Sequence, residues 1–125
     1  MIDWARVAEL RDEIGEDALA EVLLLFTEEV EEVVRRLAHG PKLAAELHFL
    51  KGSAANLGFR AFEGACVEAE RRAFAGRTED IVPGDIRTCY MASKDAFIAG
   101  LQGVCPEVAD QIRNSASASS LVMSR

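Results

Sequence analysis

The sequence is poor in aromatic residues and in basic side chains, and both shortages narrow the kind of protein it can encode. Aromatic residues make up 6% of the 125-residue chain, whereas Ala, Leu, Val and Glu dominate, which is typical of helical proteins. Asp and Glu outnumber Lys and Arg by 21 to 14, which gives a formal net charge of −7. We therefore expect no binding to nucleic acid or to an anionic membrane surface, since both need a basic patch.

The sequence also has no CxxC pair and no long apolar run. Cys66, Cys89 and Cys105 are odd in number, which is typical of small core residues in a reducing compartment, not of a disulfide framework or a zinc site. No uncharged apolar run approaches the roughly 20 residues that cross a bilayer. The charged N-terminus "MIDWARVAEL" does not have the pattern of a secretory signal. These features predict a soluble, cytoplasmic protein.

Apolar residues recur at helical spacing in five segments, and no segment alternates as a strand does. The predicted helices span about 3–14 (with Asp3 as N-cap), 16–38, 41–57 (with Pro41 at the first helical position), 60–75 and 83–101. Four long amphipathic helices with short connections favour an all-α, antiparallel up-and-down four-helix bundle, with a short extra N-terminal helix. We expect one domain over residues 1–105 and a flexible C-terminal tail over 106–125, which is rich in Ser and Ala from Asn114 onward.

The third predicted helix carries a histidine on an unusual face. Its leucine stripe (Leu43, Leu47, Leu50, Ala54 and Leu57) predicts the side that faces the core. His48 points the other way, and its neighbours on that face are Ala44, Ala45, Lys51, Gly52 and Ala55. A glycine inside a helix costs about 1 kcal/mol relative to alanine. Gly52, one turn after His48, therefore suggests that another molecule must approach the imidazole closely.

The residue types around His48 narrow its chemistry. Positions three and four residues to either side hold no His, Cys, Asp or Glu, so a metal site is poorly supported. The segment also lacks the G-K-[ST] of a phosphate-binding loop, and no serine stands in a nucleophile-elbow context. His39, at a helix C-terminus, is interpreted as structural. An open, largely neutral imidazole with Lys51 beside it fits transient phosphorylation, because the ammonium would stabilise the phosphoryl charge.

The stretch "HFLKGSAANLGF" (residues 48–59) resembles the H-x-x-K-G-[SA]-[SA]-x-x-x-G signature of histidine-containing phosphotransfer (Hpt) domains. The likeness covers roughly residues 2–102. It implies a monomeric helical bundle that passes a phosphoryl group between aspartates of response-regulator receiver domains, in relays fed by a hybrid histidine kinase. His48 would be the phosphohistidine. The resemblance implies no kinase activity and no cofactor of the domain's own, since the Mg²⁺ belongs to the receiver.

The expected helix register adds a candidate partner for His48. If the chain reverses near residues 58 and 59, antiparallel packing brings residue 48 level with residue 69 or 70. Glu70 could then hold one ring nitrogen so that the other attacks, a role that a Gln or Glu often has at this place in the family. Alternatively, Glu70 pairs with Arg71, Arg72 or solvent.

A receiver must bring its aspartate to His48, so the docking surface must surround this residue. By resemblance to the family, we expect docking contacts from Leu10, Ile14, Val22, Phe49 and Gly52. The first three residues could instead belong to the core, as apolar stripes usually do.

Two other interpretations remain open. A histidine-kinase dimerisation domain uses the same chemistry, but such helices typically carry an acidic residue directly after the histidine, where this chain has Phe49. They also need a partner ATPase domain. A non-catalytic helical interaction bundle with a vestigial histidine is the second alternative, and the joint presence of His48, Lys51 and Gly52 argues against it.

Overall fold

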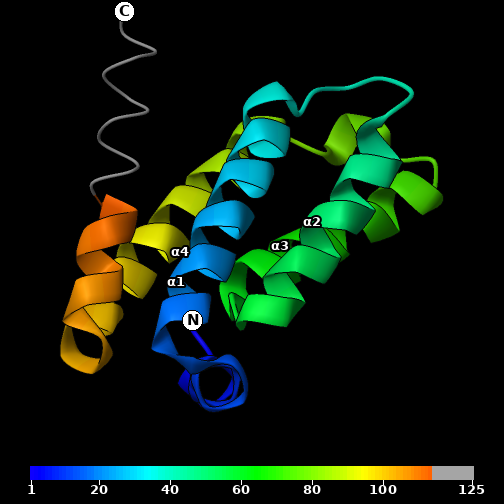
Figure 1. Cartoon of the computed structure of the whole chain (residues 1–125). Coiled ribbons are helices and arrows are strands. Elements are labelled where there is room, and N and C mark those ends of the chain that lie inside the picture. The colour runs from blue at the N-terminus through cyan, green and yellow to red at the C-terminus, as the bar shows by residue number, and fades with distance from the viewer. Residues whose placement is uncertain (114–125) are drawn as a thin grey trace, which may run out of the picture.

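The computed structural model describes residues 1–113, and helices joined by short connections make up this part of the chain (Figure 1). Its elements are α1 (Trp4–Arg36), α2 (Leu43–Leu57), α3 (Arg60–Phe74), the 3-10 turn η1 (Thr78–Asp80), α4 (Pro83–Val104) and a further helical segment over residues 106–113. Apart from an isolated bridge between Ile2 and Phe59, residues 1–113 contain no β-structure. The predicted all-α class is confirmed. None of these helices combines the length and apolar character needed to cross a membrane.

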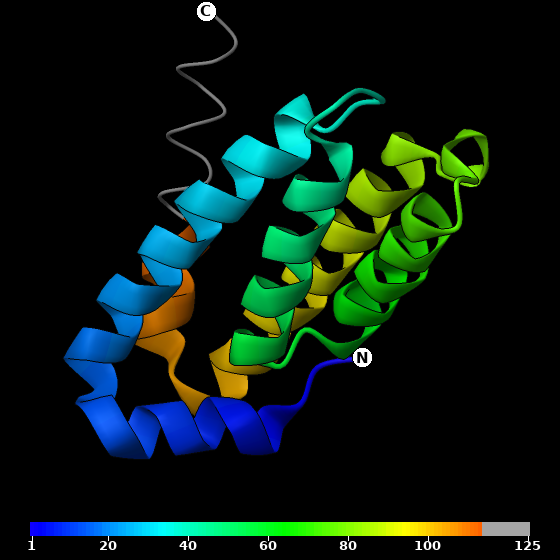
Figure 2. The same ribbon diagram turned by 90° about the vertical axis from the view of Figure 1, so that its right-hand side faces the viewer.

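Helix α1 changes direction at Gly15. This residue has φ 84° and ψ 162°, a positive φ that residues with a Cβ rarely adopt. The segment before Gly15 lies across one end of the other helices, and the segment after it runs along them (Figure 2). Asp3 caps the start of α1, since its carboxylate accepts a hydrogen bond from the backbone N–H of Arg6 at 3.3 Å. The predicted short first helix, with its end at Gly15, is thus present as the first arm of α1.

Each of the four long helices packs against two others, so that together they form a ring. Helix α2 lies between α1 and α3 (Figure 2), and α4 packs against α3 and α1. The Cα atoms of α2 and α4, both within the described residues, come no closer than 8 Å. Along α4, Arg87 donates a hydrogen bond to the carbonyl of Val34 at 3.0 Å, and Tyr90 donates one to Glu31 at 2.8 Å. Residue numbers therefore rise along α4 as they fall along α1.

The core follows the predicted stripes. All five residues of the α2 stripe are buried, as are Phe62 and Cys66 of α3 and Tyr90 and Phe97 of α4. Phe59, at the turn between α2 and α3, packs against the rings of both Tyr90 and Phe97. Burial of these apolar side chains is what holds α2 and α3 in place beneath the histidine face.

The turn between α2 and α3 is pinned to the N-terminus. Gly58 ends α2 with φ 75°, and its carbonyl accepts a 2.7 Å hydrogen bond from the N–H of Asp3. A Cβ at Gly58 would lie 2.8 Å from the carbonyl oxygen of Asp3. Only glycine fits here without displacing the backbone, because both the positive φ and the close approach exclude a side chain. This turn sets the register between α2 and α3, and so the level at which their side chains meet.

Two boundaries differ from the prediction. Pro41 lies in the turn before α2, which begins at Leu43, because the N–H of Leu43 bonds to the carbonyl of Gly40 and closes a turn first. Residues 106–113, predicted as the start of a flexible tail, instead form a helix whose Val108 and Ile112 are buried in the core. Val108 and Ile112 are four residues apart, as expected for one face of a helix, but the Ser/Ala-rich segment that follows led to the prediction of a flexible tail. The rest of the predicted tail, 114–125, lies outside the described residues.

Candidate functional site

His48 lies on the outer face of α2 with 71% of its side chain exposed. Its Nδ1 is 2.9 Å from Oε2 of Glu70 on α3. Its Nε2 has no hydrogen-bond partner among residues 1–113. The imidazole is therefore held at one nitrogen and accessible at the other.

Glu70 is buried between α2 and α3, and its two carboxylate oxygens serve different partners. Oε1 accepts a 2.6 Å hydrogen bond from Nζ of Lys51, and Oε2 faces His48. The Lys51 ammonium is the main reason that the pKa of Glu70 lies below its ordinary value. Burial opposes this lowering of the pKa, and the hydrogen bond with His48 adds to it. Glu70 is therefore ionised at neutral pH.

An ionised Glu70 determines which tautomer of His48 the site favours. A carboxylate only accepts hydrogen bonds, so Nδ1 must carry the proton that bridges to Oε2. In the neutral ring, the lone pair is then on the exposed Nε2. The arrangement produces an outward-facing nitrogen nucleophile whose ring orientation is held by a buried anion.

At position 52, one turn after His48, no side chain covers the surface of α2. A Cβ added at Gly52 would meet nothing within 4 Å. Packing therefore does not require glycine at this position, in contrast to Gly100 of α4, where a Cβ would overlap the ring of Trp4. Packing against the described residues therefore gives no reason for the cost of Gly52 to the helix.

Ion pairs mark the two sides of α2. Glu46 pairs with Arg36 of α1 at 2.8 Å, and Lys51 pairs with Glu70 of α3. His48, Phe49 and Gly52 lie on the exposed face between these pairs. On the α1 side, an open groove of about 470 Å³ is lined by Glu29, Glu32, Val33, Arg36, Lys42, Ala45, Glu46 and Phe49.

The predicted docking residues differ in accessibility. Ile14, Val22 and Phe49 are exposed, whereas Leu10 is half-buried and packs against the core. Leu25, which the sequence did not single out, is more exposed than Val22 and follows it by one turn of α1. The spacing of these two residues was the available signal.

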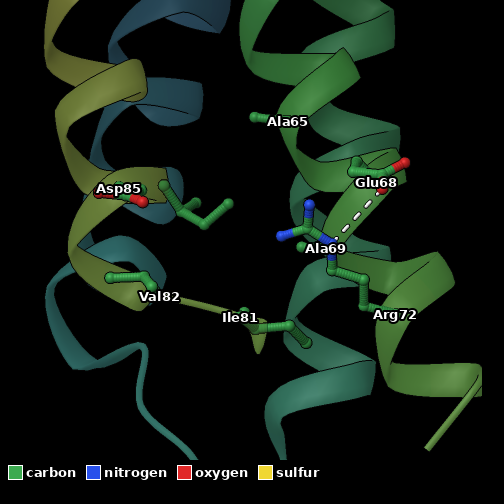
Figure 3. Close-up of a pocket in the computed structure, with 8 residues that line it drawn as sticks. Ala65, Glu68, Ala69, Arg72, Ile81, Val82 and Asp85 are labelled. Carbon is green, nitrogen blue, oxygen red and sulfur yellow. Dashed lines mark ion pairs between the residues drawn. The ribbon is translucent and has the colours of Figure 1, made fainter. Parts of the chain in front are cut away.

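Other polar groups lie away from His48. The Nε2 of His39 donates a 2.8 Å hydrogen bond to the carbonyl of Ile81, which ties this histidine to the connection before α4. A smaller hollow of about 180 Å³ lies between α3 and the start of α4 (Figure 3). Glu68 and Arg72 pair at its rim, on the side of α3 that faces α4. In the described part of the chain, no three His, Cys, Asp or Glu side chains gather as metal ligands would.

Comparison with known proteins gives one match. The family model described as "Hpt domain" matches residues 5–118 of the 125-residue chain. Neither the search of curated proteins nor the search of solved structures found a match.

Proposed function

Because the chain belongs to the Hpt domain family, which carries out histidine phosphotransfer in two-component phosphorelays, we propose that it relays a phosphoryl group through His48. The donors and acceptors are aspartates of response-regulator receiver domains, and a hybrid histidine kinase feeds the relay. In this proposal the protein acts as a cytoplasmic monomer and as a carrier without kinase activity. We also interpret its four long helices as the antiparallel up-and-down bundle expected from the sequence.

The chemical step uses the exposed nitrogen. The lone pair of Nε2 attacks the phosphorus of an aspartyl phosphate, the N–P bond forms and the P–O bond to the aspartate breaks. The aspartate leaves as a carboxylate, and the ring becomes a phosphoimidazolium that keeps its proton on Nδ1. Glu70 stabilises the positive charge that develops on the ring. The reverse step passes the phosphoryl group to the next receiver. The protein needs no cofactor of its own, since the Mg²⁺ is bound by the receiver.

The observation that carries this proposal is the difference between the two ring nitrogens of His48: one is hydrogen-bonded and the other is exposed. Nδ1 is 2.9 Å from a buried carboxylate, while Nε2 has no partner among residues 1–113 and lies on a face where Gly52 carries no side chain. Lys51 has a double role in the proposal. It balances the charge of Glu70 before transfer, and it lies one turn from the ring, within reach of a phosphoryl group after transfer.

The docking surface is proposed to surround His48. Ile14, Val22 and Phe49 would supply apolar contacts, Gly52 would allow close approach, and Leu10 would contribute the edge that packing leaves uncovered. Mixed apolar and polar surfaces of this kind are typical of transient interfaces.

The test is transfer of radiolabelled phosphoryl groups from isolated receiver domains, phosphorylated beforehand, to the purified chain. His48→Gln should abolish labelling, and His39→Gln, the other histidine, should leave it unchanged. The label should be lost in acid, as phosphohistidine is acid-labile. A non-catalytic interaction bundle would bind receivers without acquiring label. A kinase dimerisation domain would instead acquire label from ATP when its ATPase domain is added.

A further inference from the structure

Helix α3 exposes two large apolar side chains on either side of Glu70. Val67 is 46% exposed and Phe74 is 76% exposed, the highest value among the large apolar residues of the described chain. They lie three residues before and four residues after Glu70, so helical periodicity places all three on neighbouring positions of one face. Single exposed apolar residues are common. Two of them flanking the carboxylate that holds the nucleophile form a defined patch, which we call the α3 flank.

The α3 flank lies on the same side of the molecule as the nucleophile. His48 bonds to α3 through Glu70, and Lys51 of α2 reaches the same carboxylate. The imidazole therefore leaves α2 toward α3, not toward α1. A partner that reaches Nε2 must consequently lie over α3 as well as over α2.

The size of a protein interface leads to the same conclusion. A standard interface covers about 800 Å² on each partner, which corresponds to a disc of radius about 16 Å. Three and four residues of helix span about 4.5 and 6 Å along the axis. A footprint centred on His48 therefore includes Val67 and Phe74, as well as the groove on the α1 side.

We propose that the receiver domain docks on both sides of His48, and that Val67 and Phe74 are contact residues that help determine which receivers bind. This inference rests on the proposed function. The charged side chains on both sides are paired within the protein. Arg71 of the α3 flank pairs with Glu68, and Arg36 beside the α1 groove pairs with Glu46. A fitting receiver therefore presents an apolar patch, not a strongly charged one, to the α3 flank.

The experiment compares alanine variants of the α3 flank with matched controls elsewhere. The probe is a receiver domain that exchanges a phosphoryl group with the wild-type chain. Val82 (53% exposed) matches Val67, and Met91 (51% exposed) supplies a large apolar control on α4, whose Cα atoms lie more than 8 Å from those of α2. Affinity is measured by calorimetry, and single-turnover transfer is measured as a function of receiver concentration.

Phe74→Ala is expected to weaken receiver binding about tenfold and Val67→Ala a few-fold, because exposed aromatic anchors dominate interface energetics. Transfer at saturating receiver and the thermal midpoint should stay unchanged, as should every property of Val82→Ala and Met91→Ala. Equal affinity of the flank variants and the controls would overturn the inference. So would a fall in self-association, measured by sedimentation, without a change in receiver binding, since the flank would then contact a second copy of the chain.

The outcome for the wild-type chain separates this inference from the proposal beneath it. If the wild-type chain accepts no phosphoryl group from any receiver, the proposed function fails and the inference fails with it. If the wild-type chain transfers normally and the flank variants bind normally, only the inference fails.

Discussion

Replacing Gly52 with glutamine should separate helix stability from phosphotransfer. Among the described residues, a Cβ at Gly52 meets no atom within 4 Å, and position 52 is exposed, so a longer side chain can extend into solvent. Glutamine is a good helix former, and removing a glycine from a helix interior recovers up to about 1 kcal/mol. For a domain of this size, that gain corresponds to a rise of a few degrees in Tm. We therefore expect unfolding by denaturant to show equal or greater stability.

The same substitution should block transfer. The new side chain would lie one turn from His48, on the exposed face that a receiver must reach. Gly103 of α4 provides a control away from α2 and α3, since it is also exposed, lies within a helix and would place an added Cβ with no atom of the described chain within 4 Å. Gly103→Gln should keep or raise stability, with normal transfer. Single-turnover labelling of both variants measures the difference.

Two results would refute this reasoning. Transfer at the wild-type rate by Gly52→Gln would mean that the glycine does not serve close approach to His48. A large loss of stability in Gly52→Gln, with none in Gly103→Gln, would mean that Gly52 serves packing after all.

Four further variants test other parts of the account. Lys51→Ala should slow transfer by no more than about tenfold, far less than loss of the histidine, since a contact between its ammonium and a phosphoryl group on the exposed His48 ring is solvated and contributes about 1 kcal/mol; an inactive variant would indicate a larger role. Glu70 has a lowered pKa, so it stabilises the fold at neutral pH, and this contribution is lost as pH falls through that pKa. Glu70→Gln should therefore flatten the decline of unfolding free energy in acid, and an unchanged pH profile would contradict the pairing. Gly100→Ala should cost about 1–3 kcal/mol in denaturant unfolding, because its Cβ would overlap the ring of Trp4, and wild-type stability would show that the contact is loose. Leu10→Ala should cost less than the roughly 2–5 kcal/mol of a fully buried leucine, because the residue is half-buried, and a weaker receiver affinity in calorimetry would identify it as a docking residue.

Local patterns in the sequence predicted the helices well. The α2 stripe and the ends of α2 and α3 depend on apolar spacing and on glycine at the turn, which act over a few residues. Counting across the turn at Gly58 also brought Glu70 level with His48, and the two side chains are 2.9 Å apart. Antiparallel neighbours joined by a tight turn have little freedom of register, which is why this count was informative.

Features that depend on packing between distant elements could not be predicted in the same way. The direction of the first arm of α1 follows from the φ and ψ of Gly15 and from contacts with distant parts of the chain, such as that of Trp4 with Phe97. The burial of Val108 and Ile112 depends on a surface that the other helices create. The sequence also did not predict that Phe74 is exposed, because an aromatic residue near an apolar stripe is ordinarily assigned to the core.

Nitrogen-detected NMR of the chain labelled with ¹⁵N-histidine, before and after transfer from a phosphorylated receiver, tests the central claim most directly. The chain has two histidines, so both imidazoles can be followed in one spectrum. We predict that phosphorus couples to Nε2 of His48, that Nδ1 of the same ring keeps its proton, and that His39 does not change. Phosphorus on Nδ1 of His48, on His39, or on neither ring would contradict the account.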